Sequence, residues 1–508
     1  MVYADTPLSY ATFLEHVERV AAGFQALGLK RGDRVAILMQ NCPQFPIAFF
    51  GILRAGGIVT STSPIYTPRE ASHQWQDSGI RWLVADRALQ PLAEASRSQC
   101  PSLKGIIWTD PADYSKPGAA RLKKTLAQSR PLRPDSSGCL DWRDFLRARR
   151  RPGKDVSRPS DVACLQYTGG TTGVSKGAML THHNLALNAV QTCTWLLGEK
   201  PRRETFVAAL PFFHIYATTC VMISSIHCRG TTVIVPRFEL EAVLAAVEKH
   251  RPTIYHGVPT MYVAFNHVPN IGSRGFSSVR ICMSGGAPLP VSVQQRFESL
   301  TGTKLVEGYG LTECSPVTHV NPAGATQAGS IGQLIPGTTA RIMDLKTGTH
   351  EVPLGEPGEL LIKGPQVMKG YWKKPDETAR VLEKGWLSTG DIATRDAEGF
   401  FRIVDRKKDL ILVGGFNVYP REVEEVLFEH PGILEAGVVG VMDDYRGESV
   451  KAFVVCKPGI TLTEDQVVHH CRQNLAAYKV PRQVEFRDSL PKSGVGKYLR
   501  RELRKPGT

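Results

Sequence analysis

The 508-residue sequence contains no hydrophobic run long enough to cross a membrane. No window approaches the roughly 18 consecutive apolar residues that a spanning helix needs. Charged side chains at Asp5, Glu15, Glu18 and Arg19 interrupt the N-terminal stretch, which is unlike a secretion signal. We therefore expect neither a signal peptide nor an integral membrane protein.

The sequence also lacks any C-x-x-C pair, although it has eleven cysteines. An odd number of scattered cysteines favours neither a disulfide framework nor a zinc site. With 42% hydrophobic and 22% charged residues, the composition excludes a disordered or fibrous chain. These features predict a globular protein of a reducing compartment, and we expect it in the cytoplasm.

Positive charge exceeds negative charge by 14, and much of the excess lies in one segment. Residues 111–160 contain 13 lysines and arginines, five acidic residues and six prolines, which is typical of a solvated surface loop. The basic run at 147–159 has no interleaved aromatics, so we do not expect nucleic acid as a partner. Two interpretations of this basic loop stay open: a surface insertion without a partner, and peripheral contact with anionic lipid at the inner face of the membrane.

Helix and strand patterns alternate along most of the chain. Apolar residues recur at helical spacing in the first pattern, at Phe13, Val17, Val20 and Phe24. A buried-strand pattern follows at 34–39, and the same alternation returns at 231–249 and 280–300. We therefore expect an α/β fold with a large N-terminal domain of parallel or mixed sheets and packed helices.

The pattern changes after about residue 337. Residues 337–363 and 399–413 alternate apolar and polar side chains between glycine and proline turns, as antiparallel strands do. The last hundred or so residues have the pattern of a compact unit with both helices and strands. We expect a small β-rich subdomain followed by a small α+β C-terminal domain.

The densest local pattern is YTGGTTGVSKG at residues 167–177. It follows a strand pattern at 162–166 and precedes a helix expected to begin near Thr181. Glycines let backbone N–H groups turn onto one anion, threonine hydroxyls add donors, and Lys176 adds positive charge. The chain has no G-x-x-x-x-G-K-[ST] loop and no G-x-G-x-x-G fingerprint, so the run predicts a phosphate cradle of another kind. Taken alone, the run could also be a flexible connection.

This run resembles the signature of the adenylate-forming superfamily, which comprises acyl- and aryl-CoA synthetases, peptide-synthetase adenylation domains and luciferases. Further motifs that resemble those of the superfamily follow in its order: LPFFH at 210–214, SGGAPL at 284–289, GYGLTE at 308–313, STGD at 388–391, DRKKD at 405–409, GGFNVYP at 414–420 and PKSGVGK at 491–497. The resemblance covers essentially the whole chain. Gly170 in the phosphate loop and the segments VEGYGLTECSPVTH, GPQVMKGYW and DLILVGGFNVYPREVEEVL look most like bacterial-type medium- and long-chain fatty-acyl-CoA synthetases.

The resemblance implies a two-step ligation that uses ATP, Mg²⁺ and coenzyme A. A carboxylate first forms an acyl-adenylate, and the CoA thiol then displaces AMP. By resemblance, the catalytic residues are Lys497, His214 and Glu313, and the metal is placed by Thr168 and Glu313. The residues that the resemblance assigns to ATP are Thr168, Gly169, Gly170, Thr171, Thr172, Gly173, Lys176, Gly286, Ala287, Tyr309, Gly310, Thr312, Asp391 and Arg406. It assigns Phe213, His214 and Gly308 to the acyl chain, and Gly414, Gly415 and Phe416 to CoA.

The resemblance also implies a mobile C-terminal lid that rotates about Asp405, which divides the chain into an adenylation domain at 1–404 and a lid at 405–508. The tunnel for the acid is expected around 215–225, 255–263 and Gly308. These segments offer no charged partner for an amino-acid ammonium, so we expect a fatty acid.

Three alternatives stay open: an aryl-CoA ligase of the coumarate or benzoate type, a fatty-acyl-AMP ligase that loads a carrier protein, and a non-catalytic lipid- or nucleotide-binding homologue. The chain begins close to the first helix of the superfamily, without the N-terminal segment that some members use in dimer contacts. We therefore expect either a monomer or a homodimer.

Overall fold

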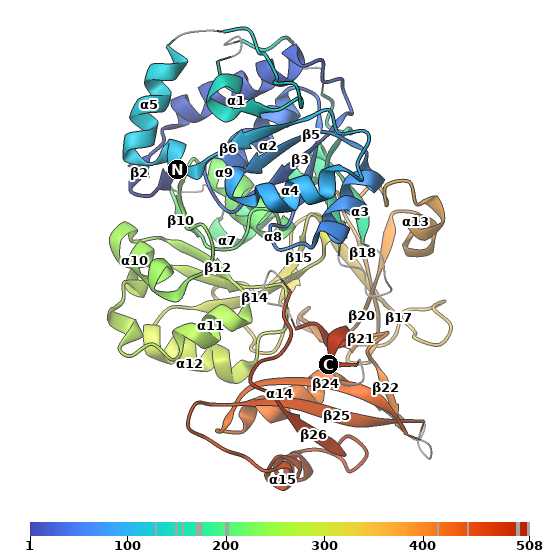
Figure 1. Ribbon diagram of the computed structural model, residues 1–508. Coiled ribbons are helices and arrows are strands. Elements are labelled where there is room, and N and C mark those ends of the chain that lie inside the picture. The colour runs from blue at the N-terminus through green and yellow to red at the C-terminus, as the bar shows by residue number, and fades with distance from the viewer. Residues whose placement is uncertain are drawn as a thin grey trace.

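The computed structural model in Figure 1 describes residues 1–127, 130–147, 151–154, 157–168, 175–198, 203–413, 416–443, 447–493 and 498–504. None of the helices in these ranges combines the length and the apolar character that a bilayer crossing requires.

Two large sheets form the body of the protein, and most of their strands run parallel. The order of the first sheet is β7 (Leu140–Asp141), β6 (Gly105–Thr109), β5 (Ile80–Asp86), β3 (Arg34–Leu38), β4 (Ile58–Thr62), β8 (Val162–Thr168) and β9 (Lys176–Thr181). The order of the second is β16 (Gln333–Leu334), β15 (Val317–Val320), β14 (Leu305–Gly310), β13 (Ile281–Ser284), β12 (Ile254–Gly257), β10 (Thr205–Ala208), β11 (Thr231–Ile234), β1 (Val2–Tyr3) and β2 (Thr6–Pro7). Antiparallel strands occur only at the ends of these sheets, at β9, β15, β16 and β2, among the residues described.

Two smaller sheets follow along the chain. The order of the third is β17 (Thr339–Met343), β18 (Gly358–Lys363), β20 (Trp386–Arg395) and β19 (Leu382–Glu383), with β21 (Phe401–Arg406) also paired to β20. The order of the fourth is β23 (Phe416–Val418), β22 (Ile411–Val413), β25 (Gly447–Cys456) and β24 (Ile433–Asp443), with β26 (Gln483–Phe486) paired to β25. The expected α/β fold with a β-rich subdomain and a small C-terminal unit is confirmed, and this last unit lies at the opposite end of the molecule from α5 (Figure 1).

Helices cover the two large sheets and one face of the fourth sheet (Figure 1). In the first sheet region they are α1 (Tyr10–Ala26), α2 (Gln44–Arg54), α3 (Pro68–Ser78), α4 (Gln90–Arg97), α5 (Lys116–Leu126) and α6 (Trp142–Phe145). Around the second sheet they are α7 (His182–Leu197), α8 (Ile215–Ala217), the π-helix η3 (Thr218–Ile223), α9 (Ser224–His227), α10 (Leu240–His250), α11 (Pro259–Phe265) and α12 (Val291–Thr301). Later in the chain come α13 (Pro375–Val381), α14 (Pro420–Glu429), α15 (Glu464–Asn474) and α16 (Arg500–Leu503). Short 3₁₀ turns are η1 (Arg87–Leu89), η2 (Pro111–Tyr114), η4 (Ile271–Ser273), η5 (Phe276–Ser278) and η6 (Thr312–Cys314).

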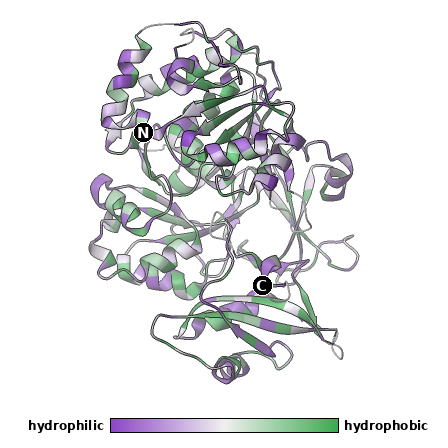
Figure 2. Ribbon diagram, in the orientation of Figure 1, coloured by the Kyte–Doolittle hydropathy of each residue, from purple (hydrophilic) through white to green (hydrophobic). Residues whose placement is uncertain are grey.

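The first helix illustrates how local sequence determines these elements. The Ser9 side chain accepts a hydrogen bond of 3.1 Å from the N–H of Thr12 and so caps the first turn of α1. The four apolar residues that predicted this helix are all buried, and Gly28 beyond its end has φ +74°, a conformation that costs glycine least. Figure 2 shows the hydrophobic residues concentrated on the central strands, where the large sheets are covered on both faces.

The basic segment at 111–160 is not the solvated loop that its composition predicts. Within its described part it contains η2, α5, β7 and α6, and β7 pairs in parallel with β6 at the edge of the first sheet. Trp142 and Phe145 are completely buried, and Phe145 packs so closely on α1 that a side-chain carbon at Gly23 would lie 2.7 Å from its ring. Burial of these two aromatics offsets the high charge around them and anchors the segment to the core.

Candidate active site

Two antiparallel strands, β8 and β9, flank the phosphate-loop motif. Thr168, the last residue of β8, stands opposite Lys176, the first residue of β9, in an antiparallel pair. Gly169, Gly170, Thr171, Thr172 and Gly173 lie outside the described residues. The helix expected near Thr181 is α7, whose first turn is capped by a Thr181–Asn184 capping box. The intervening strand β9 was not predicted from the sequence.

Strand β9 is held on its second side by residues 368–372. The N–H of Lys369 donates to the carbonyl of Met179 at 2.9 Å, the N–H of Met179 donates to the carbonyl of Gly370 at 2.8 Å, and the N–H of Trp372 donates to the carbonyl of Gly177 at 2.8 Å. Ala178 and Tyr371 form an antiparallel bridge at the centre of this contact. The hairpin is therefore fixed between two parts of the chain that are far apart in the sequence.

Tyr371 links the carboxylate of Glu313 to strand β9 and residues 368–372. The Tyr371 hydroxyl donates a hydrogen bond of 2.7 Å to Oε1 of Glu313, and the N–H of Met368 donates one of 2.7 Å to its backbone carbonyl. The ammonium of Lys176 lies 5.2 Å from the centre of the Tyr371 ring and forms an ion pair with Glu377. Glu313, Lys176 and the end of the hairpin are thus brought to one place.

A second carboxylate, Asp391, is fixed by two partners. The Tyr309 hydroxyl donates to Oδ2 of Asp391 at 2.5 Å, and Nε of Arg406 lies 3.4 Å from Oδ1. Asp391 on β20 and Arg406 on β21 stand directly opposite each other in the sheet. Burial, reinforced by the charge of Asp391, raises the pKa of Tyr309, so its hydroxyl stays protonated and serves as the donor.

The remaining nucleotide motifs surround these carboxylates along the second sheet. Gly286 and Ala287 follow the end of β13, whereas Gly308 and Gly310 lie in the neighbouring β14, and Thr312 lies in η6 with Glu313. A side-chain carbon at Gly310 would lie 2.1 Å from the carbonyl oxygen of Pro316, so only glycine fits this close approach.

Phe213 and His214 come directly before α8. The carbonyl of Phe213 accepts a hydrogen bond of 2.8 Å from Nε2 of Gln166 on β8, which ties this segment to the strand that leads into the hairpin. Nδ1 of His214 accepts a hydrogen bond of 3.3 Å from the N–H of Tyr216. The predicted acyl-site motif is therefore anchored to the first sheet, close to the start of the phosphate loop.

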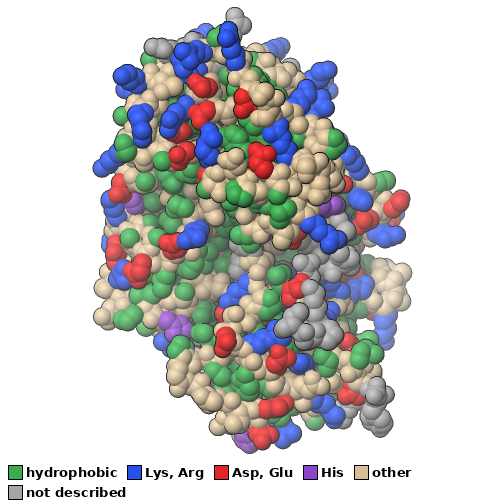
Figure 3. Space-filling model, in the orientation of Figure 1, with side chains coloured by type: hydrophobic (Ala, Val, Ile, Leu, Met, Phe, Trp, Pro, Cys, Tyr) green, Lys and Arg blue, Asp and Glu red, His purple; other side chains and the backbone are tan. Residues whose placement is uncertain are grey.

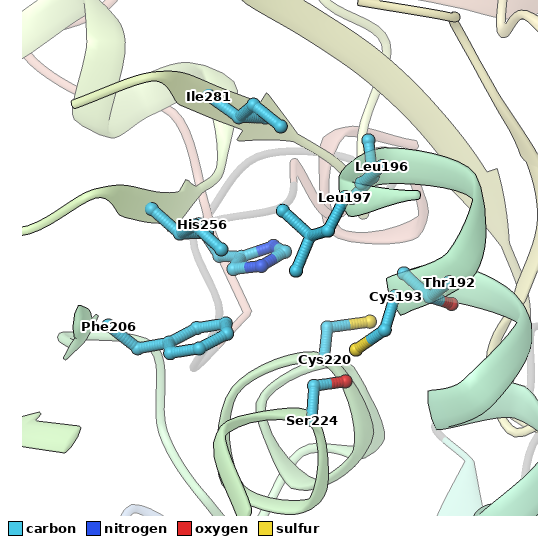
Figure 4. A pocket seen from close by; sticks show the side chains of 10 residues that line it. Thr192, Cys193, Leu196, Leu197, Phe206, Cys220, Ser224, His256 and Ile281 are labelled. Atoms are coloured by element: carbon cyan, nitrogen blue, oxygen red, sulfur yellow. The ribbon is translucent and has the colours of Figure 1, made fainter. Parts of the chain in front are cut away.

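A pocket opens beyond this segment, between α7, the η3–α9 helix and the second sheet (Figure 4). Its walls include Cys193, Leu196, Cys220, Ser224, Phe206 and His256. His256 stacks on Phe206 and meets the Tyr216 ring edge-on, and its burial lowers the pKa of His256 to about 4. The imidazole is consequently neutral, and the pocket carries no charge among its lining residues.

The hinge candidate Asp405 lies at the end of β21 with its side chain buried. Its carboxylate accepts hydrogen bonds from the N–H of Arg421 at 2.8 Å and from Nη1 of Arg500 at 3.0 Å. Phe416 is 59% exposed and stacks on Tyr478 with 4.8 Å between ring centres. Gly414, Gly415 and Lys497 lie outside the described residues, so their predicted roles stay predictions.

Sequence reasoning missed Tyr371 and the segment around it. The run GPQVMKGYW supported the family resemblance but no residue in it was predicted to belong to the site. An invariant position in related sequences could have indicated it. In one sequence the tyrosine looks like an ordinary turn or core residue.

The chain is similar to known proteins in sequence and in fold. A family model described as AMP-binding enzyme matches residues 1–372, and one described as AMP-binding enzyme C-terminal domain matches residues 422–497. The long-chain-fatty-acid–CoA ligase of Bacillus subtilis (strain 168) is 44% identical, over 98% of this chain and 89% of its own length. The solved structure of an anthranilate CoA ligase in complex with anthranoyl-AMP has a TM-score of 0.88 at 27% identity and covers 99% of this chain and 92% of its own. ATP-bound MatB from Rhodopseudomonas palustris has a TM-score of 0.86 at 31% identity, with 98% and 93% covered.

Proposed function

We propose that this chain, which belongs to the AMP-binding enzyme family, joins a medium- to long-chain fatty acid to coenzyme A at the expense of ATP. Acyl-CoA ligases of this family use ATP, Mg²⁺ and CoA. In the first step a carboxylate oxygen attacks the α-phosphorus, the bond from that phosphorus to the bridging oxygen breaks, and pyrophosphate leaves. In the second step the thiol gives up its proton, its sulfur attacks the acyl carbonyl, and AMP leaves.

One observation carries the proposal. Tyr309 and Glu313 stand four positions apart on the β14–η6 segment, and each is hydrogen-bonded to a residue of the region between β18 and β21. The partner of Tyr309 is Asp391, and the partner of Glu313 is Tyr371, which also bridges to the phosphate hairpin. Two carboxylates and a cationic lysine are thereby brought near the strands that flank the glycine-rich residues, which supports a site for a triphosphate and a ribose.

We assign the nucleotide contacts as follows. Asp391 accepts hydrogen bonds from the ribose hydroxyls, while Tyr309 and the backbone of Gly286 and Ala287 contact adenine. The glycine- and threonine-rich residues 169–174 and Lys176 hold the β- and γ-phosphates. Because Lys176 forms an ion pair with the half-buried Glu377, nucleotide binding exchanges that carboxylate for phosphate oxygens.

The residues present fit a magnesium ion. Glu313 uses one carboxylate oxygen to accept from Tyr371, and its Oε2 has no hydrogen-bond partner among the described residues. A carboxylate oxygen and the Thr168 hydroxyl are ligands of the hard type that Mg²⁺ prefers. When bound, Mg²⁺ neutralises charge on the phosphate oxygens.

Pyrophosphate release from purified protein tests the proposal. Acids from acetate to palmitate, with benzoate and coumarate, are each assayed with ATP and Mg²⁺, with and without CoA. We expect turnover to peak on an alkyl chain and to require CoA for thioester formation. If acyl-adenylate forms but CoA never converts it to thioester, the protein is instead a ligase that loads a carrier protein. If no acid causes pyrophosphate release, the proposal that the protein is a catalyst is contradicted.

We propose further that residues 405–508 form a lid that turns about Asp405 between the two steps. In support, side chains from Ile411 onward build a hydrophobic core of their own, whereas Ile403 still packs on the core of the large domain. Lys497 serves adenylation by neutralising charge between the carboxylate and the α-phosphate. Lys497→Ala should therefore abolish acid-dependent pyrophosphate release yet still convert supplied acyl-adenylate to thioester. Equal loss of both half-reactions would contradict this division of labour.

We also propose that the region of α5 contacts anionic lipid. Figure 3 shows Lys and Arg side chains gathered at the upper end of the molecule, and Arg121, Lys123 and Lys124 on α5 are exposed. Arg147 is a poor candidate for this contact, because its side chain is 10% exposed and paired with Asp144 at 3.3 Å. Co-sedimentation with phosphatidylglycerol vesicles should fall when the three α5 cations are changed to Gln, and unchanged binding would count against the proposal.

A further inference from the structure

We propose that Tyr371 is a positioning residue that orients the Glu313 carboxylate and couples it to the phosphate hairpin. Its hydroxyl occupies Oε1 and so leaves Oε2 as the oxygen available to the metal. The inference rests on the proposed function, because the metal role of Glu313 belongs to that proposal. The inference adds Tyr371 to the residues of the proposed site, and it explains how the Glu313 carboxylate and the phosphate loop are linked.

The backbone of Tyr371 is fixed on both sides. Its N–H donates a hydrogen bond of 2.9 Å to Oγ1 of Thr378, near the start of α13, and it bridges to Ala178 in β9. Nine per cent of its surface is exposed, so the ring has little freedom to move. A hydroxyl delivered from so constrained a backbone can hold a carboxylate in one orientation, which a solvent-exposed side chain could not do.

The ring also contacts the hairpin directly through Lys176, at 5.2 Å from its centre. One side chain therefore receives the hairpin lysine on its face and donates to the metal-site carboxylate at its edge. Glu313 in turn has one of its two carboxylate oxygens occupied by the Tyr371 hydroxyl.

A purely structural hydrogen bond would stabilise the fold without affecting metal affinity. The chain offers a comparison in Tyr114, which is buried in η2 and whose hydroxyl shares a hydrogen bond of 2.8 Å with Nδ1 of His16 on α1. Both tyrosines are buried, and both use the hydroxyl in a side-chain hydrogen bond. Only Tyr371 of the two contacts a residue proposed to bind the metal, and Tyr114 belongs to none of the nucleotide motifs.

The test is Mn²⁺ binding in the presence of ATP and without acid or CoA, followed by the electron paramagnetic resonance signal of free Mn²⁺. Mn²⁺ is used because it accepts the same oxygen ligands as Mg²⁺. Tyr371→Phe should weaken Mn²⁺ binding about 10- to 100-fold, as loss of a group that supports a metal ligand typically does. Tyr114→Phe should change it less than about twofold, although it also removes a buried side-chain hydrogen bond. Equal effects of the two variants would overturn the inference.

Glu313→Gln separates this inference from the proposed function. If Glu313→Gln binds Mn²⁺ as the wild type does, the metal role of Glu313 fails, and the inference fails with it. If Glu313→Gln loses Mn²⁺ and Tyr371→Phe does not, the inference alone is wrong. In the double variant, Tyr371→Phe should cause no further loss, because Tyr371 acts through Glu313; independent losses that multiply would also overturn it.

Discussion

Arg500 donates a hydrogen bond of 3.0 Å to the carboxylate of Asp405, 95 positions earlier in the chain. The same guanidinium pairs with Glu424 on α14 at 2.6 Å and lies 3.5 Å from Asp409. One cation in the last helix thus compensates three carboxylates around the proposed hinge. Burial raises the pKa of Glu424, and Arg500 opposes that rise.

Arg500→Met should strongly destabilise the C-terminal unit. Removing the cation leaves largely buried carboxylates uncompensated, a loss of about 3 kcal/mol. Amide hydrogen exchange of β24 and β25 should accelerate roughly a hundredfold as a result. Arg504→Met is the matched control, because Arg504 is 37% exposed and pairs with Asp409 alone, at 3.3 Å, among the described residues; it should cost less than about 1 kcal/mol. Similar exchange rates in both variants would show that Arg500 stabilises the C-terminal unit no more than Arg504 does.

Asp391→Asn should weaken ATP binding while leaving the fold intact. The change removes the negative charge that we propose accepts hydrogen bonds from the ribose hydroxyls, and hydrogen bonds to charged groups contribute about 1.5–3 kcal/mol each. We expect the KM for ATP to rise at least about tenfold, measured by pyrophosphate release with a saturating acid. Asp396→Asn provides the control, since Asp396 pairs with Arg402 at 3.0 Å beyond the other end of the β20–β21 pairing. A KM shift of the same size in both variants would argue against a nucleotide role for Asp391.

The Cys220→Phe variant should prefer fatty acids with shorter chains than the wild type does. Cys220 lines the small cavity in Figure 4 and lies in the segment expected to form the acyl tunnel, so a phenyl group there would block the path that we propose for the distal end of the chain. Each excluded methylene is worth about 1–3 kcal/mol, so kcat/KM for palmitate should fall at least about tenfold relative to octanoate. Cys220→Ala keeps the pocket open and should leave the ratio unchanged. If the ratio of kcat/KM for palmitate to that for octanoate is unchanged in Cys220→Phe, the acyl chain binds elsewhere.

Glu307→Gln should change how stability depends on pH. Glu307 is buried on β14, Oε1 accepts from the N–H of Leu289 at 3.2 Å, and Oε2 has no partner among the described residues. Burial raises the pKa of Glu307 to about 7, against the opposing charge of Arg421. Between the unfolded pKa near 4.5 and about 7, the folded state holds a proton that the unfolded state has lost, so this group's contribution to stability falls as pH rises.

The glutamine variant carries no such proton. The Tm of Glu307→Gln minus that of the wild type should therefore increase between pH 5 and pH 8. Thermal unfolding monitored at several pH values in this range measures the difference. A constant difference would mean that Glu307 titrates normally.

Local patterns predicted much of the fold. The spacing of Phe13 and its partners marked α1, and the glycine-threonine run marked the connection after β8, although the strand β9 that follows it was not predicted. Composition misled at 111–160, because charge counts do not reveal that Trp142 and Phe145 fill space beside α1. One buried aromatic can anchor a segment whose other side chains all face water.

Local patterns could not predict contacts between residues that are far apart in the sequence. Neither the pairing of β9 with residues 368–372 nor the Tyr371–Glu313 hydrogen bond follows from periodicity, because each joins parts of the chain that local sequence does not connect. The motifs of the superfamily placed Asp391 and Tyr309 in one site, but their direct contact required the structure.

The pairing of β9 with residues 368–372 has a consequence for synthesis on the ribosome. Ala178 and its partner Tyr371 are separated by roughly 190 residues, so the second side of β9 is unpaired until that much more chain has emerged. An unpaired strand edge is a template for pairing with other chains. The proposed nucleotide site is thus among the last parts of the large domain to be completed, and a nascent chain that stalls before residue 372 exposes an unpaired strand edge beside the proposed phosphate loop.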